Sequence, residues 1–364
     1  MLLGKVVWGT LRTACIPALL VAAVAVLAGC VGPMTTPTPA APTLEAEPGL
    51  EHLPDEHVAT LRSLEKVDDY PLYTMRYYGP YTEWADAGGD QGRVNAVRAA
   101  PVPEWACSLF VALAEPDAPV FGRGFDWQYS PAVLLFTDPP EGYASVSMVD
   151  IEHWYGADEA KALTDLPLAQ RTELLNLPFY PYDGMNEHGL VVGMAAVPDS
   201  ERPYDASKAT LGSLEIIRAL LDGARDVGEA VDLLDEYNIT WRGGPPLHYM
   251  LADATGRAVL VEFYEGERML LPNTDPWHLA TNHLRAIASQ ASGSGCWRYD
   301  ALSGRLQETG GQLTASGAMD LLQDVSVPTT QWSIIYGIRT GDVQVAMGRK
   351  YGEVHTFHLP LATE

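Results

Sequence analysis

The stretch EWACSLFVALAEPDAPVFGRGFDW, residues 104–127, decides how this chain is interpreted. Cys107 stands at the head of an apolar run, and Arg123 and Asp126 follow in a second run that contains two glycines. Short apolar runs separated by proline and aspartate are typical of neighbouring β-strands. A buried thiol with a purely structural role needs no charged neighbours, whereas a nucleophilic thiol needs a base and an electropositive setting. The stretch therefore indicates a β-sheet that carries a reactive cysteine.

Similar runs continue along the chain. Strand-like segments lie at 132–137, 143–151, 247–264, 331–348 and 353–359. Helical periodicity occurs at 205–224, where Asp205 or Ser207 is a predicted cap, and at 227–237, 297–308 and 314–324. Strands at both ends of the core with helices between them predict an α+β fold in which helices cover antiparallel sheets.

Composition excludes one class of partner. The 364 residues carry a formal net charge of −24, and 47% of them are hydrophobic. This is the composition of a globular protein with a substantial core. Because a strongly negative field repels nucleic acid, we expect no DNA or RNA partner.

The N-terminus has the features of an export signal. A weakly basic start precedes an uncharged apolar run at 15–28 that is short for a membrane span, and the run ends in LAGC, with Cys30 last. This ending resembles the lipobox of bacterial lipoproteins, which implies a signal peptide at 1–29 and a lipid on Cys30. Residues 30–50 are rich in proline, threonine and alanine and predict an extended tether. We expect an exported lipoprotein on the outer face of the cytoplasmic membrane, or on the outer membrane of a diderm.

Two cysteines, Cys107 and Cys296, remain after the signal and the lipid site. An exported protein with two such cysteines invites a disulfide between them, and this is the structural alternative for Cys107. The second interpretation is chemical. If the chain is cut between Ala106 and Cys107, the freed α-amine, with a pKa of about 7.7–8.0, can serve as the base for its own thiol. Residues 51–106 would then be a removable pro-segment, and 107–364 the catalytic domain.

A set of motifs in order supports the chemical interpretation. The chain resembles the N-terminal-nucleophile (Ntn) hydrolases of the linear amide C–N hydrolase group, which includes choloylglycine hydrolases and acyl-CoA:6-aminopenicillanic acid acyltransferase-like enzymes. The resemblance covers about 106–350 and rests on Cys107-Ser108, GRGFDW, YDGMNEHGLVVG, LATNH, Arg298 and TQWSIIYG. It implies a four-layer αββα sandwich.

The resemblance also implies roles for single residues. Cys107 would supply the nucleophilic sulfur and the amine base, and Asp126 would orient that amine. Arg123 would favour the ionised thiol, and Arg298 would complete the polar network. Asn282 would donate its side-chain amide to the tetrahedral oxyanion.

The sequence also departs from the choloylglycine pattern. Many of those enzymes have an asparagine where this chain has Ala196. A second oxyanion donor would therefore be a backbone N–H at Ala195 or Ala196, which favours the acyltransferase-like side of the group. The sequence contains no HExxH motif, P-loop or G-x-S-x-G motif, so we expect no metal and no cofactor.

These observations predict a self-processing cysteine hydrolase that cleaves a small-molecule N-acyl amine, with acyltransferase activity as an extension. The alternative is a non-catalytic lipoprotein that binds a small amphiphile and holds Cys107 in a disulfide with Cys296. A third interpretation is a cysteine peptidase that uses a histidine as its base. The sequence does not indicate the amide or the oligomeric state.

Overall fold

A computed structural model describes residues 48–81, 106–198, 200–241, 244–287 and 295–363. All of them lie in one compact unit, 41–364. The predicted signal peptide, Cys30 and nearly all of the predicted tether lie outside the described residues. In the described part of the chain, no helix is long and apolar enough to cross a membrane.

The larger of the two main sheets has nine strands in the order β1-β2-β5-β6-β7-β8-β11-β12-β13. All neighbours are antiparallel except β2 and β5, which are parallel. In chain order the strands are β1 (Glu65–Asp68), β2 (Leu72–Arg76), β5 (Ala132–Thr137), β6 (Ser145–Asp150), β7 (Asp183–Asn186), β8 (Val191–Ala196), β11 (Leu247–Ala252), β12 (Ala258–Tyr264) and β13 (Glu267–Pro272).

The second main sheet has six antiparallel strands in the order β14-β3-β4-β15-β16-β17. Its strands are β3 (Ser108–Ala112), β4 (Val120–Asp126), β14 (Trp277–Ala280), β15 (Thr330–Gly337), β16 (Asp342–Met347) and β17 (His355–His358). A small parallel pair, β9 (Ala209–Gly212) and β10 (Tyr237–Thr240), completes the β-structure described.

Short helices surround the sheets. The α-helices are α1 (Asp55–Arg62), α4 (Glu152–Glu159), α5 (Glu215–Gly223), α6 (Val227–Leu234), α7 (Trp297–Thr309) and α8 (Ala315–Asp324), and the 3₁₀ segments are η1 (Leu163–Asp165), η2 (Leu168–Gln170) and η3 (Thr172–Phe179). The Asp226 side chain caps α6, and α7 ends where Gly310 takes a left-handed conformation.

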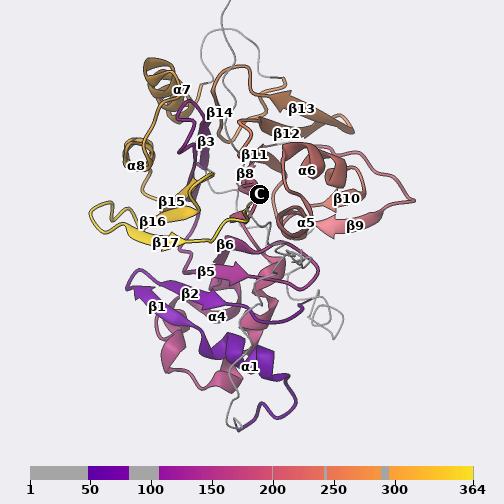
Figure 1. Cartoon of the computed structure of the whole chain (residues 1–364), viewed down its shortest axis with the longest axis vertical. Helices are drawn as coiled ribbons and strands as arrows, with labels where there is room; N and C mark the ends of the chain where they lie inside the picture. The colour runs from indigo at the N-terminus through magenta and orange to yellow at the C-terminus, as the bar shows by residue number, and fades with distance from the viewer. Residues whose placement is uncertain (1–47, 82–105, 199, 242–243, 288–294, 364) are drawn as a thin grey trace, which may run out of the picture. The chain divides into compact units, whose positions relative to one another are not determined.

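Four layers are visible in Figure 1: α7 and α8, the six-stranded sheet, the nine-stranded sheet, and α5 with α6. The central core forms where the inner faces of the two sheets meet. Gly193 on β8 illustrates this close packing, because a Cβ there would come within 2.9 Å of Leu109 and of Phe121. The α+β prediction and the predicted αββα layering are confirmed.

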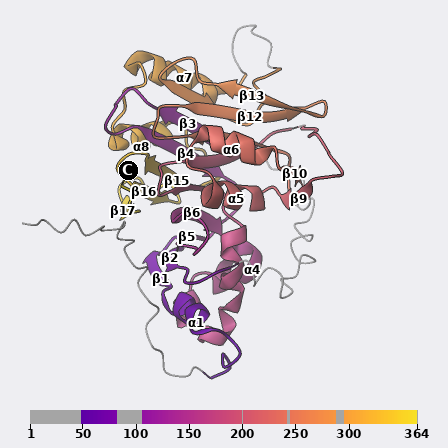
Figure 2. The ribbon, with the colours of Figure 1, turned by 45° about the vertical axis from the view of Figure 1, so that its right-hand side comes forward.

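Residues 50–81 form part of the larger sheet. Strand β2 pairs with β5 over five residues, and α1 packs with η2 and η3 over a second apolar core. Figure 2 shows this indigo segment beside β5 and α4. Apolar side chains of α1 and β2 thus share one core with those of β5 and η3.

One predicted helix is shorter than expected. The segment 205–224 begins with a turn in which Asp205 accepts hydrogen bonds from Ser207, and it continues as strand β9. The helix α5 starts only at Glu215, without a side-chain cap. The predicted cap at Asp205 or Ser207 is therefore wrong, because pairing of β9 with β10 prevails over the local helical pattern.

Candidate active site

Cys107 immediately precedes β3 and is buried in the core between the two sheets. Burial raises the pKa of its thiol above the ordinary value, whereas the positive charges of Arg123 and Arg298 act to lower it. Asp126 raises it further by its negative charge. The three charged residues predicted from the sequence are thus the ones that act on the thiol, and in the intact chain the neutral thiol is favoured.

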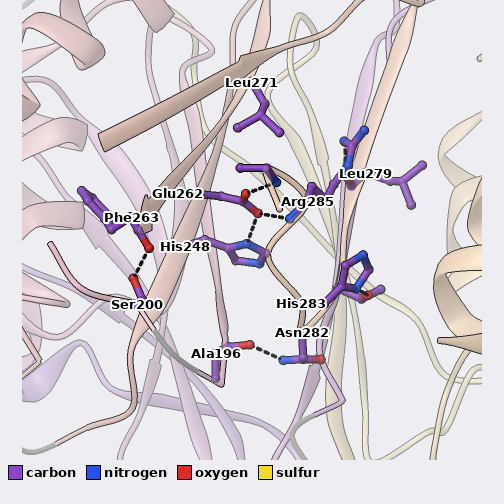
Figure 3. Close-up of polar contacts among 12 residues, drawn as sticks. Ala196, Ser200, His248, Glu262, Phe263, Leu271, Leu279, Asn282, His283 and Arg285 are labelled. Atoms are coloured by element: carbon purple, nitrogen blue, oxygen red, sulfur yellow. Dashed lines mark hydrogen bonds and ion pairs between the residues drawn. The ribbon is translucent and has the colours of Figure 1, made fainter. Parts of the chain in front are cut away.

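Arg298, near the start of α7, binds the backbone around the predicted cleavage point. Its Nη1 donates to the carbonyl oxygens of Ala106 and Cys107, and its Nη2 donates to Asn282 Oδ1 at 3.1 Å. The amide group of Asn282 also donates from Nδ2 to the carbonyl oxygen of Ala196 at 2.9 Å, as Figure 3 shows. Because Arg298 fixes the oxygen end of this amide, its NH₂ end is defined, and one of its two N–H groups remains available.

Arg123 on β4 forms a buried ion pair that the sequence analysis missed. Its Nη1 lies 2.9 Å from Asp183 Oδ2, and neither side chain is exposed. Its guanidinium also lies 4.5 Å from the ring centre of Phe125 and 5.4 Å from that of Trp332. Burial raises the pKa of Asp183, which Arg123 opposes. Asp183 is the first residue of the short strand β7, Asp-Gly-Met-Asn, so no apolar pattern around it indicated a buried carboxylate.

Asp126 ends β4 and is also buried. Burial raises its pKa to about 6, while a hydrogen bond from the Thr330 hydroxyl acts to lower it. No ion pair joins it to Arg123 among the described residues, and both side chains are buried. Thr330 is a second site residue that the sequence analysis missed.

Ala195 and Ala196 end β8, opposite His248 and Leu247 of β11. The N–H of the next residue, Val197, donates to Pro246, which continues this pairing. In an antiparallel pair the backbone groups of successive residues point to alternate sides. The N–H of Ala195 therefore points towards β11, whereas that of Ala196 points the other way, beside the carbonyl that Asn282 binds. The geometry favours Ala196 over Ala195 as a backbone donor.

Cys107 and Cys296 are both free thiols. Cys107 lies in the core between the sheets, whereas the sulfur of Cys296 accepts a hydrogen bond from the Thr281 hydroxyl at 3.5 Å, just before α7. The disulfide that the alternative interpretation requires is therefore not formed in this structure.

Side chains that could bind a metal do not cluster in the described ranges. Three or more histidine, cysteine or acidic side chains arranged to hold a metal ion do not occur among these residues. His355 and His358, three positions apart on β17, instead bind Asp68 and Asp342 respectively.

Comparison with known proteins supports this fold. Residues 179–324 match the family model "Acyl-coenzyme A:6-aminopenicillanic acid acyl-transferase", a range that contains Asn282 and Arg298 but begins after Cys107. Penicillin V acylase from Agrobacterium tumefaciens superposes with a TM-score of 0.50 at 17% identity, covering 70% of this chain and 86% of the acylase. The chain has the fold of the Ntn hydrolases.

A second Ntn-hydrolase structure is similar to the same extent. A mutant of the conjugated bile acid hydrolase from Clostridium perfringens has a TM-score of 0.50 at 15% identity, covering 70% of this chain and 92% of that one. No curated protein matches the sequence. The resemblance to choloylglycine hydrolases and acyltransferase-like enzymes is confirmed, and at these identities the solved structures establish the fold alone.

Proposed function

We propose that this protein is a self-processing cysteine hydrolase of linear amides, with Cys107 as its nucleophile. The observation that carries the proposal is that Arg298 binds the backbone on both sides of the predicted cleavage point, beside a buried thiol on which the charges of Arg123 and Asp126 also act. Asn282 joins this group through Arg298. The family model and the two similar structures are associated by name with acyl transfer and amide hydrolysis, which supports this chemistry.

Self-processing would use the same groups. The Cys107 thiol would add to the carbonyl carbon of Ala106, whose oxygen Arg298 already binds. Collapse of this adduct would break the C–N bond and move the acyl group from nitrogen to sulfur, and water would then hydrolyse the thioester. The products would be a carboxylate on Ala106 and a free α-amine on Cys107, beside the Asp126 carboxyl.

Turnover would follow from that amine. It would take the thiol proton as the sulfur attacks the substrate carbonyl, and the oxyanion would accept hydrogen bonds from the free N–H of Asn282 and the backbone N–H of Ala196. The leaving amine would receive the proton and depart, leaving an acyl-enzyme. Water would release the acid and restore the thiol, whereas an amine acceptor would instead complete an acyl transfer.

Cleavage would separate the chain that ends at Ala106, which includes the pro-segment 51–106, from the catalytic domain, and we propose that the two stay bound. Strand β2 would remain paired with β5, and Asp68 would keep its contacts with Lys350 and His355, both at 2.8 Å. At the other end, Tyr81 donates to Asp222 at 2.5 Å. The two fragments should therefore co-elute in size-exclusion chromatography without denaturant and separate in 6 M urea; separation in buffer would contradict this.

We also propose that Cys30 carries a lipid that anchors the protein at the outer face of a bacterial membrane. The LAGC motif supports this. Labelling of cells with an alkyne fatty acid should tag the wild type and not the Cys30→Ser variant. Equal labelling, or equal release of both into the soluble fraction, would contradict a lipoprotein.

Substrate screening tests the proposed activity. The panel would contain penicillin V, a glycine-conjugated bile acid and octanoyl p-nitroanilide, with amine release as the measurement. Wild type should hydrolyse at least one amide and show a mass increase equal to one acyl group on Cys107 after rapid quenching. Cys107→Ala should do neither. Equal hydrolysis by this variant, or an inactive wild type, would contradict the proposed function.

A further inference from the structure

The loop that carries Asn282 is fastened at two points to the nine-stranded sheet (Figure 3). At one point Asn282 binds Ala196 on β8. At the other, the backbone N–H groups of Arg285 and Ala286 donate to the two carboxylate oxygens of Glu262 on β12, at 2.8 and 2.7 Å. The loop 281–286 thus spans from β8 to β12, and strand β11 lies between them.

His248 of β11 lies beneath this loop. It is opposite Ala195 on one side, and the register of β11 and β12 places it opposite Glu262 on the other. Its Nδ1 is 3.1 Å from Glu262 Oε1, and both side chains are fully buried. In Figure 3 the ring lies between Glu262 and the hydrogen bond that joins Asn282 to Ala196.

One nitrogen of the His248 ring lacks a hydrogen-bond partner among the described residues. With Nδ1–H donated to Glu262, Nε2 of a neutral imidazole is an acceptor, and it has no hydrogen-bond partner among the described residues. A buried polar atom without a partner costs about 1–3 kcal/mol. Glu262 itself is fully satisfied: burial would raise its pKa, but the hydrogen bonds from His248, Arg285 and Ala286 lower it below its ordinary value.

We propose that Glu262 and His248 are positioning residues, which hold the 281–286 loop so that the free N–H of Asn282 points at the tetrahedral oxyanion. The proposal rests on the proposed function. Glu262 fixes the loop backbone three and four residues after Asn282, and His248 orients the Glu262 carboxylate. A donor misplaced by about 1 Å can cost about 100-fold in rate, so the effect should reach the chemistry although neither residue touches substrate.

The test compares Glu262→Gln with a matched control, Asp253→Asn. Asp253 directly follows β11 and is also a buried carboxylate that accepts backbone N–H groups, from Val227 and Thr255, but it lies at the other end of the strand. Both variants should lose stability. Glu262→Gln should lower kcat by about 10- to 100-fold, less than the ~100- to 1,000-fold loss expected when an oxyanion donor itself is removed, with KM changed less than about threefold.

An aldehyde supplies a readout that stability does not move. Octanal would form a hemithioacetal in which the Cys107 sulfur bonds to the carbonyl carbon and the carbonyl oxygen takes the oxyanion position, the thiol proton passing to the α-amine. Inhibition by octanal should weaken about tenfold or more in Glu262→Gln and stay within about twofold of wild type in Asp253→Asn. Alkylation of Cys107 by iodoacetamide should be equal in all three.

His248→Gln provides a second variant if Glu262→Gln does not fold, and it should show the same pattern with a smaller loss. A Glu262→Gln or His248→Gln protein whose kcat and octanal affinity match those of Asp253→Asn overturns the positioning role while leaving the proposed function intact. A wild type that hydrolyses none of the three panel amides overturns both.

Discussion

Two buried acid–base pairs involve the nine-stranded sheet and differ in what they join: one links the two sheets, and the other fastens the 281–286 loop. Asp183 on β7 receives Arg123 on one oxygen, with the Trp332 indole at 3.4 Å, and the Tyr336 hydroxyl on the other. Glu262 on β12 accepts hydrogen bonds from His248 and from two backbone N–H groups of the loop. Both bases keep a nitrogen without a hydrogen-bond partner among the residues described, Nε of Arg123 and Nε2 of His248. The difference suggests that the first pair is part of the frame behind the thiol, whereas the second lies at the loop that the reaction would use.

The largest effect should come from breaking the pair of Asp183 with Arg123. Asp183→Asn leaves the Arg123 charge buried without its carboxylate, and breaking a buried ion pair in this way typically costs about 3–5 kcal/mol. Urea denaturation of uncut Cys107→Ala protein, with and without Asp183→Asn, measures this difference in unfolding free energy.

Asp150→Asn is the matched control for this change. Asp150 is a buried carboxyl on the neighbouring strand β6, and burial raises its pKa to about 7, so it is substantially protonated near neutral pH. Replacing it should cost less than about 1 kcal/mol. Equal losses from the two substitutions would show that the Arg123 pair has no special weight.

A smaller loss is expected from the pair of Glu262 with His248. In His248→Gln the Glu262 carboxylate keeps the two backbone N–H groups of Arg285 and Ala286. We therefore expect a loss of only about 1–2 kcal/mol in the same urea assay. A loss as large as that of Asp183→Asn would remove the distinction between the two pairs.

Asp126 adds a further pH dependence of stability. Because burial raises its pKa to about 6 in the folded chain, the folded state binds its proton more tightly than the unfolded state does. Stability from this group is present at low pH and is lost as pH rises from about 4 to 6, by on the order of 2 kcal/mol. Urea denaturation of uncut Cys107→Ala protein, with and without Asp126→Asn, measures this loss across the same pH range.

The direction in which stability changes with pH tests whether folding raises the pKa of Asp126. In uncut protein, the stability of Asp126→Asn relative to its parent should increase between about pH 4 and pH 6. A relative stability that falls would show that folding lowers the pKa of Asp126, and one that stays constant would show that folding does not shift it; either result contradicts the raised pKa. The smallest effect is expected from the exposed pair of His358 with Asp342. Asp342→Asn should change the unfolding free energy by no more than about 0.5 kcal/mol in the same urea assay.

What the sequence could predict follows from how local each interaction is. Cys107, Arg123 and Asp126 lie on or beside two strands joined by a short connection, and Ser108 pairs with Gly124. Their spacing along the chain is therefore also their spacing in the site. Asn282 and Arg298 were located only through the family resemblance, because no local pattern brings residues so distant in sequence to Cys107.

The remaining features depend on pairings that no short segment encodes. Asp183 meets Arg123 only when the two sheets pack, and Glu262 meets His248 through the register of β11 with β12. The helix expected from residue 205 failed for the same reason, since β9 finds a partner in β10. Sequence patterns therefore predicted the sheets with their covering helices, whereas the pairings of Asp183 and Glu262 required the assembled sheets. The role of Cys107 as nucleophile stays a prediction.

Intact mass measurement with N-terminal sequencing of purified wild type and Cys107→Ala tests the central claim most directly. The account predicts a new N-terminus at Cys107 in the wild type and none in the variant, with the two wild-type fragments summing to the uncut mass plus one water. A wild-type chain that stays uncut, or a variant cleaved at the same bond, would contradict self-processing and with it the role of the Cys107 amine.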